Sequence, residues 1–174
     1  MSYITTFTGK HFNPINPSLE DIDMKDIAHS LSLICRASGH VKYFYSVAQH
    51  SIACYIEAKT RGYSERIQLG CLLHDASEAY LSDIIRPIKP KLSEYLVIED
   101  KLQEIIWNKF LDKPLSKSEK EKIFEIDDAM LSYEFNLLMP ETISDDYKTI
   151  ISKPDLKFVD PNIIEKQFID LLHK

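Results

Sequence analysis

The stretch 72–83, Leu72-Leu73-His74-Asp75-Ala76-Ser77-Glu78-Ala79-Tyr80-Leu81-Ser82-Asp83, places a histidine and three carboxylates directly after an apolar run. A helix from about Ser64 to Ser82 puts His74 and Glu78 on one face, with Asp75 three residues before Glu78. Burial of several acidic groups is costly unless a positive charge compensates it, and a divalent cation does this economically. The stretch therefore predicts a metal site on a mostly buried helix.

The composition indicates one ordinary globular domain, residues 1–174. Apolar residues make up 44% of the chain, and the formal charge of -6 is spread along it, so no basic stripe predicts a stable nucleic-acid partner. Cysteine occurs 3 times with no CxxC pair, which is typical of reduced, buried thiols in a cytosolic protein. We expect a cytoplasmic protein, because neither a signal peptide nor an apolar run long enough to cross a membrane is apparent.

The pattern favours an all-α fold with a short irregular N-terminal segment. Only 4 glycines occur, and strand-like alternation is confined to Tyr3–Phe7. Pro14 and Pro17 exclude a regular helix from residues 1–17, which we predict to form a loop or a short hairpin. The metal-site core should cover about 18–139, and a C-terminal helix about 161–173.

Apolar periodicity and capping residues place the individual helices. Ser18 is the predicted N-cap of a first helix that ends near Arg36–His40, and Ser118 with Glu121 is the predicted capping box of the helix that stops before Pro140. Asp160 is the predicted N-cap of the last helix. The other expected helices cover about 46–59, 64–82 and 93–111.

Inward-facing polar residues on different helices complete a candidate metal site. His50 lies beside an apolar stripe, His74 and Asp75 are adjacent, and Asp127 has apolar neighbours one turn away on both sides; Asp128 is the reserve for the last position. Two imidazoles and two carboxylates suit manganese, iron, cobalt, nickel or zinc, among which the donor types do not choose. A structural zinc would instead favour a closed tetrahedral set, often with cysteine.

The order His50, His74-Asp75, Asp127 resembles the H...HD...D signature of the HD-domain metal-dependent phosphohydrolases. The segment 74–78 followed by Asp83 is similar to the HDASE...D segment of bacterial HD-domain 5′-deoxynucleotidases. Residues 83–89 are similar to their D-x-P-x-P-x-K, with Ile85 in place of the first proline. Segments 26–32 and 44–51 resemble small bacterial and phage HD proteins, so the likeness covers roughly 8–134.

The resemblance implies an HD-domain helical bundle in which His50, His74, Asp75 and Asp127 hold the metal. Further residues then take roles at the phosphate. Glu78 and Asp83 would position the attacking water or pass protons, whereas Arg36 and Lys89 would neutralise phosphate oxygens. Arg86 and Lys91 are weaker candidates for that last role.

The implied reaction is metal-dependent hydrolysis of the 5′-phosphate of a (deoxy)nucleoside monophosphate, in a chain that forms a homo-oligomer. A deoxynucleoside triphosphate hydrolase is the alternative within the same family. Two interpretations from other classes also stand: a nucleotide sensor that binds without turnover, and a structural protein whose His74-Asp75 pair is ordinary core. Metal content after purification separates the last of these from the others.

Overall fold

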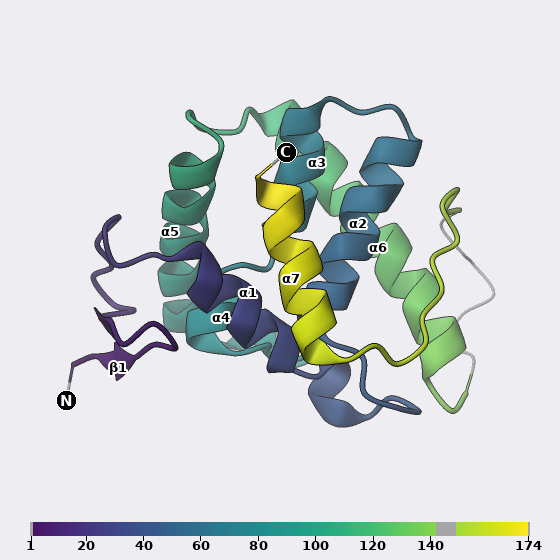
Figure 1. Ribbon diagram of the computed structural model, residues 1–174, viewed down its shortest axis with the longest axis horizontal. Coiled ribbons are helices and arrows are strands. Elements are labelled where there is room, and N and C mark those ends of the chain that lie inside the picture. Colours follow the sequence, from purple (N-terminus) through teal and green to yellow (C-terminus); the bar gives the residue numbers. More distant parts are fainter. Residues whose placement is uncertain (1, 142–148, 174) are drawn as a thin grey trace.

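The computed structural model describes residues 2–141 and 149–173 and confirms the all-α prediction (Figure 1). The short N-terminal hairpin is present as well: β1 (Ile4–Thr5) pairs antiparallel with β2 (His11–Phe12). Two short 3-10 helices, η1 (Arg36–Gly39) and η2 (Lys89–Lys91), lie in the connections. The α-helices within the described ranges are α1 (Met24–Leu33), α2 (Val47–Thr60), α3 (Glu65–Leu72), α4 (Glu78–Leu81), α5 (Ser93–Phe110), α6 (Lys117–Leu138) and α7 (Pro161–Leu172).

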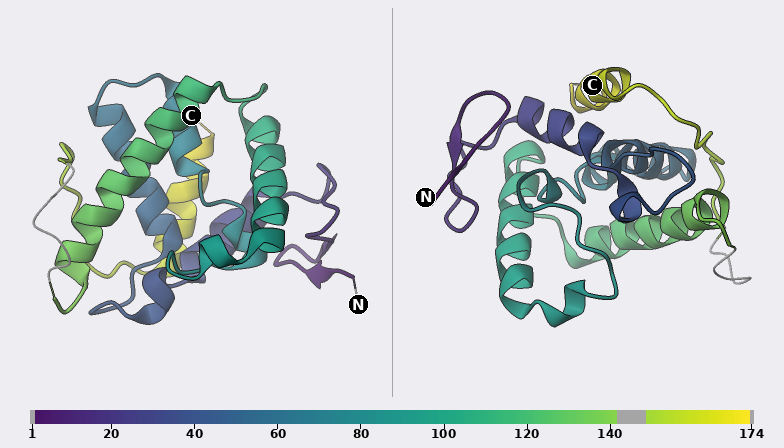
Figure 2. Two further views of the ribbon diagram at one scale, coloured as in Figure 1. Left: turned by 180° about the vertical axis from the view of Figure 1, so that it is seen from behind. Right: turned by 90° about the horizontal axis from the view of Figure 1, so that it is seen from below.

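Helices α2 and α3 form the centre of the bundle, with α6 packed against both of them (Figures 1 and 2). Helix α7 covers α1 and α2 from the opposite side, where its Ile164 and Phe168 are buried. Burial of these apolar faces is the main favourable contribution to folding. The largest fully buried apolar side chains come from β2, from α1, α3, α5, α6 and α7, and from the connections between elements: Tyr45, Phe12, Phe168, Ile22, Ile27, Leu31, Leu72, Leu73, Leu102, Ile106, Ile123 and Ile126.

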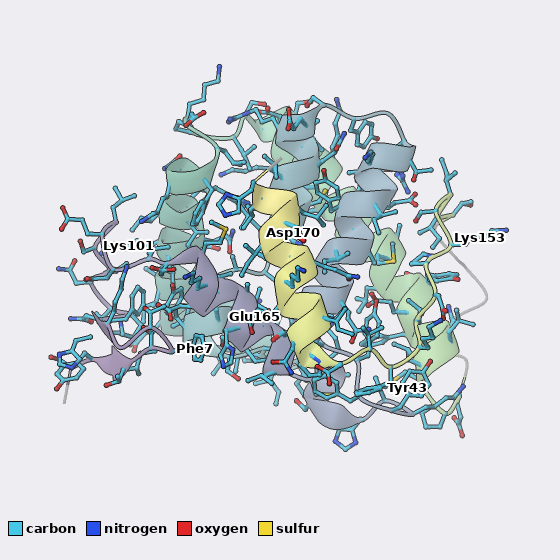
Figure 3. The ribbon with its side chains drawn as sticks, viewed as in Figure 1. Phe7, Tyr43, Lys101, Lys153, Glu165 and Asp170 are labelled. Atoms are coloured by element: carbon cyan, nitrogen blue, oxygen red, sulfur yellow. The ribbon has the colours of Figure 1, made fainter. Side chains whose placement is uncertain are left out.

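The first helix is held between the N-terminal segment and α7. Phe7 stacks on His29 of α1 with ring centroids 3.6 Å apart, and Nδ1 of that histidine lies 2.9 Å from Glu165 on α7 (Figure 3). The backbone N–H of Thr8 donates to Asp26 at 2.7 Å. These contacts explain why an irregular segment is ordered beside the bundle.

Two predicted helix starts are wrong. Helix α1 begins five residues later than Ser18 suggested, because residues 18–21 form a turn and Asp23 accepts the N–H of Lys25 as the actual N-cap. The capping box of α6 uses Ser116 and Glu119 instead of Ser118 and Glu121. The predicted N-cap of α7, Asp160, is confirmed, as is a helix start at Ser46 for α2.

The helix predicted over 64–82 is interrupted. Helix α3 ends at Leu72, residues 73–77 form turns, and α4 begins at Glu78. Inside the break the N–H groups of Ala76 and Glu78 donate to carbonyls three residues back. The side-chain amide of Gln103 on α5 donates to the Leu73 carbonyl at 2.7 Å and accepts the Ser77 N–H at 3.1 Å. A distant side chain thus satisfies backbone groups that a continuous helix would have paired internally.

Two further expectations concern the cysteines and the membrane. Cys54 and Cys71 are buried, Cys35 is half-buried, and all three thiols are free. Over the ranges 2–141 and 149–173, the structure contains no helix with the length and apolar character needed to cross a membrane.

Candidate metal centre

The structure brings together the four residues expected to hold a metal. His50 lies on α2, His74 and Asp75 lie in the break between α3 and α4, and Asp127 lies on α6. The two histidine Nε2 atoms are 3.3 Å apart. Oδ1 of Asp127 is 3.0 Å from the first and 3.5 Å from the second, while Oδ2 of Asp75 is 3.3 Å from Nε2 of His74 and 3.8 Å from that of His50.

The hydrogen bond made by Nδ1 of each imidazole determines the direction of the lone pair on Nε2. Nδ1 of His50 lies 3.0 and 2.9 Å from the two carboxylate oxygens of Glu134, and Nδ1 of His74 lies 2.7 Å from the carbonyl oxygen of Cys71. Both partners are acceptors, so Nδ1 carries the hydrogen in each ring. The neutral rings therefore direct two Nε2 lone pairs toward each other and toward Asp127. This arrangement requires a positive charge, from a metal ion or from protons.

The electrostatics agree with this requirement. Burial opposes a charge on His74, but the carboxylates of Asp75 and Asp127 outweigh it and raise the pKa of the imidazole well above its ordinary value. Burial likewise opposes the ionised form of Asp127, yet His50 and His74 hold the pKa of that carboxyl well below its ordinary value. The carboxylates favour the protonated histidines, and the histidines favour the ionised carboxylates. A divalent cation between them could replace the two protons on His50 and His74.

Asp127 and not Asp128 belongs to this cluster. The side chain of Asp128 is 40% exposed, and its Oδ1 lies 2.8 Å from Arg86. The same guanidinium lies 3.3 Å from Oδ2 of Asp127, the oxygen turned away from the histidines.

Cys54 is a further potential donor that sequence reasoning missed. It lies one helical turn after His50 on α2, with Sγ 3.6 Å from His50 Nε2, and ligand atoms of His50, Cys54 and His74 all lie within 4.8 Å of one another. This buried group could hold a metal ion. Burial, together with Asp127 and Glu134, raises the pKa of the Cys54 thiol well above its ordinary value. The histidines are therefore shared by two donor sets, one completed by Cys54 and one by Asp75 and Asp127.

A cavity of about 780 Å³ opens on one side of the centre. His74, Asp75 and Asp127 line it, whereas the fully buried His50 and Cys54 are not among its described lining residues. One face of α6 forms a wall, with side chains at three- and four-residue intervals: Lys120, Phe124, Asp127, Leu131 and Phe135. The centre therefore has one open side and one closed side.

The two carboxylates predicted to be catalytic, Glu78 and Asp83, both line this cavity. Burial, with help from Asp75 and Asp83, raises the pKa of Glu78 well above its ordinary value, and burial is also the largest cause of a raised pKa at Asp83. Within the described part of the chain, Oε2 of Glu78 is buried without a hydrogen-bond partner. The wall of the cavity thus contains a buried protonatable carboxyl with an unpaired oxygen.

The predicted phosphate-binding cations are present in the cavity but are already paired. Arg36 is buried, 3.5 Å from Asp75 and 3.8 Å from Glu134, and its Nε has no hydrogen-bond partner among the described residues. Lys89 lies 2.8 Å from Glu99 and 3.8 Å from Glu78.

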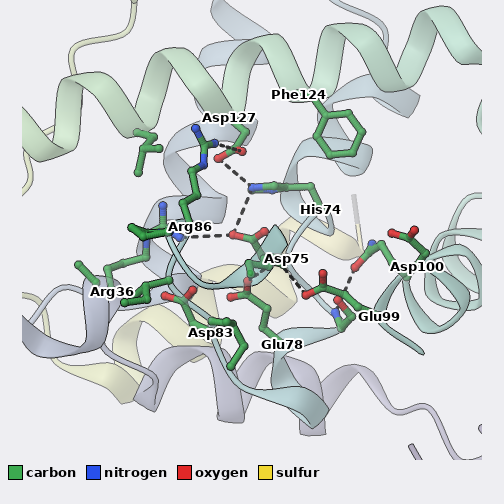
Figure 4. A pocket seen from close by; sticks show the side chains of 18 of the residues that line it. Arg36, His74, Asp75, Glu78, Asp83, Arg86, Glu99, Asp100, Phe124 and Asp127 are labelled. Carbon is green, nitrogen blue, oxygen red and sulfur yellow. Dashed lines mark hydrogen bonds and ion pairs between the residues drawn. The ribbon is translucent and has the colours of Figure 1, made fainter. Parts of the chain in front are cut away.

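In Figure 4, Arg36 and Arg86 lie to one side of His74 and Asp75, with Glu99, Asp100 and Phe124 to the other. Lys91 is not among the described residues that line the cavity. Sequence reasoning missed Glu134 and Glu99. A signal existed for Glu134, which lies two turns after Asp127 on the same helix.

Comparison with known proteins yields relatives without an assigned activity. No family model matches the chain. An uncharacterized Escherichia coli (strain K12) protein, YfdR, is 43% identical over 110 residues, which is 63% of this chain and 59% of that protein. An uncharacterized Rhodobacter capsulatus protein, RCAP_rcc00048, is 34% identical over 108 residues, 59% of this chain and 55% of that protein. In each case the similarity spans under two thirds of the relative's length.

Proposed function

We propose that the chain is an HD-superfamily phosphohydrolase that removes the 5′-phosphate of (deoxy)nucleoside monophosphates. The observation that carries the proposal is the open side of the metal centre. There Asp75 and Asp127 face a cavity that also contains Glu78, Asp83 and Arg36. Donors, protonatable carboxyls and a cation around one concave site are the parts that hydrolysis of a phosphate ester needs.

In this proposal His50, His74, Asp75 and Asp127 hold the metal, and the donor set suits manganese, iron, cobalt, nickel or zinc. A divalent ion held there would supply a Lewis acid and lower the pKa of a water. The mixed nitrogen and oxygen set is preferred to a closed structural site because three of its four donors, His74, Asp75 and Asp127, line the cavity.

The other residues act on the phosphate and on protons. Glu78, whose pKa is raised well above its ordinary value by burial and by Asp75, can donate a proton to the leaving oxygen, while Asp83 orients the water. The guanidinium of Arg36, which lines the cavity, places a positive charge beside the site where the phosphate would bind. Lys89 adds a second positive charge beside Glu78.

The charges around the cavity favour a monophosphate over a triphosphate. Seven carboxylates line it, Asp75, Glu78, Asp83, Glu99, Asp100, Glu104 and Asp127, against four cationic side chains, Arg36, Arg86, Lys89 and Lys120. With Glu78 protonated as the proton donor, six negative carboxylates face four cationic side chains, and a divalent metal would balance this excess without leaving positive charge for a longer phosphate chain. A monoester with one phosphate therefore meets less repulsion than a chain of three. The volume of about 780 Å³ is within the usual range for small-ligand sites.

The test is phosphate release from ribo- and deoxynucleoside mono-, di- and triphosphates with manganese, cobalt, zinc or magnesium. Wild type should release orthophosphate from monophosphates. Asp75→Ala should lose both metal and activity, whereas Glu78→Gln should keep metal and lose activity by about 10²- to 10⁴-fold. Asp100→Asn is the matched control, because this carboxylate lines the cavity but is exposed, and it should remain active.

Other outcomes identify the alternatives. Release of triphosphate as a unit would identify a triphosphohydrolase. Tight nucleotide binding without turnover on any substrate would identify a sensor. A chain that purifies without metal, and whose stability does not respond to added metal, would be the structural protein.

A further inference from the structure

We propose that Cys54 is a thiolate ligand of the metal, on the closed side of the centre. This inference rests on the metal centre of the proposed function and adds a donor to it. Three observations carry it: the distances among the donor atoms, the position of Cys54 on α2, and the contrast between the closed and the open side.

The distances place the sulfur within the cluster. Ligand atoms of His50, Cys54 and His74 lie within 4.8 Å of one another, so an ion between the histidine Nε2 atoms would also be near the Cys54 sulfur. The spacing of His50 and Cys54 at i and i+4 puts both on one face of α2. Cys71 is also buried and free but is outside this group.

The two sides of the centre differ in chemistry. His74, Asp75 and Asp127 line the cavity, whereas His50 and Cys54 are enclosed in the bundle. A ligand on the enclosed side does not compete with a substrate. The sulfur would therefore determine which metal is bound and leave the cavity-facing positions to the reaction.

Ligation changes the protons but involves no oxidation. The S–H bond breaks, its proton passes to solvent, and the sulfur forms a bond to the metal with both of its electrons. A soft thiolate beside two imidazoles favours zinc, cobalt, iron or nickel over manganese and magnesium. Among the metals left open by the nitrogen and oxygen donors, the inference thus disfavours manganese.

The experiment is addition of cobalt(II) to metal-free full-length chain, followed by absorption spectroscopy. Wild type and the control Cys71→Ser should show a sulfur-to-cobalt charge-transfer band in the near ultraviolet. Cys54→Ser should keep the visible bands of bound cobalt and lose the near-ultraviolet band. On binding each cobalt ion, Cys54→Ser should also release one proton fewer than wild type.

Cobalt bound to wild type without the near-ultraviolet band overturns the inference, as does a band that persists in Cys54→Ser. Either result leaves the proposed function intact if phosphate release continues. If wild type binds neither cobalt nor zinc, the inference fails, and the proposed function fails with it if manganese, iron and nickel do not bind either. Should Cys54→Ser not fold by circular dichroism, zinc-edge X-ray absorption of wild type decides: a sulfur neighbour at about 2.3 Å supports the inference, and a shell of only nitrogen and oxygen refutes it.

Discussion

The carboxylate of Glu134 lies against the imidazole of His50 inside the bundle, with both of its oxygens within 3.0 Å of Nδ1. The same carboxylate accepts the hydroxyl of Tyr45 at 3.0 Å and lies 3.8 Å from Arg36. Glu134 is 1% exposed, so these contacts are not shared with solvent. It fixes the ring of His50 with Nε2 toward the other donors, which makes it a positioning residue for the candidate metal centre.

Glu134→Gln should weaken metal binding by about 10- to 100-fold, because the amide has one acceptor oxygen and no negative charge with which to orient His50. Competition with a chromogenic chelator measures the affinity. Tyr45→Phe removes only the hydroxyl contact and is the matched control, with a much smaller effect expected. Equal affinities in wild type and Glu134→Gln would mean that Glu134 has no positioning role.

Neighbouring aspartates on α6 should respond differently to the same change. Asp127→Asn replaces an oxygen that lies 3.0 Å from His50 Nε2 and should lower the bound metal strongly, whereas Asp128→Asn should leave it near the wild-type level. Metal content after extensive dialysis, by mass spectrometry, provides the comparison. Metal loss in Asp128→Asn alone would reverse our assignment.

The stability of the chain should depend on pH through Glu57, whose hydrogen-bond partners are not residues of the candidate metal centre. This buried carboxylate accepts the N–H groups of Ile151 and Ser152 at 3.0 and 2.9 Å, and Nε of Arg61 at 2.7 Å. Burial opposes its ionisation, but these bonds outweigh it and lower its pKa. Since the folded-state pKa lies below the unfolded one, the stabilisation is present above the unfolded pKa and is lost as pH falls.

Glu57→Gln should therefore lower the free energy of unfolding at neutral pH by about 1 to 3 kcal/mol. The difference from wild type should shrink as the pH falls from the unfolded pKa of a glutamate, about 4.3, through the lower folded-state pKa of Glu57. Urea unfolding at several pH values measures both effects. Glu125→Gln is the control, because Glu125 also pairs with Arg61 but its side chain is 58% exposed. A difference that stays constant with pH would contradict the linkage.

The contact between α3 and α6 at Gly70 predicts a second stability effect. A methyl group added there would lie 2.5 Å from Cδ1 and 3.3 Å from Cγ1 of Ile123. Alanine gains about 1 kcal/mol of helix propensity over glycine, but overpacking costs about 1 to 3 kcal/mol, so Gly70→Ala should be destabilising overall. Ile123→Val removes the nearest atom, and the double variant should recover stability. A double-mutant cycle without positive coupling would show that the side chain moves aside at no cost.

Much of the fold follows from short-range patterns in the sequence. The capped starts at Ser46 and Asp160 are where the local signals predict them, because a side chain that accepts a nearby N–H needs only its own neighbours. The start of α1 was missed since Ser18 and Asp23 are both acceptable caps by sequence. The break at residues 73–77 was missed because its backbone is satisfied by Gln103, about 30 residues further along the chain.

In the candidate site, too, some features follow from local sequence patterns and others depend on contacts between distant parts of the chain. His50, His74, Asp75 and Asp127 could be chosen from helical faces and from the likeness to HD-domain proteins, and the fold brings them together. The pairing of Lys89 with Glu99 depends on how α5 packs beside the loop after α4, which no local pattern encodes. Cys54 was passed over because a cysteine on an apolar helix is usually core, and only its distance to the histidines distinguishes it.

The cavity on the open side of the centre also has a consequence for the order of binding. His50 and Cys54 are enclosed, so an ion would reach them through the cavity in which the proposed nucleotide substrate would also bind. Under the proposed function we therefore expect the metal to bind before the substrate, and a nucleotide in the cavity to block the exit of the ion. Chelators should therefore remove the metal more slowly from the nucleotide-bound protein than from the free protein, because the bound nucleotide would cover the route by which the ion leaves.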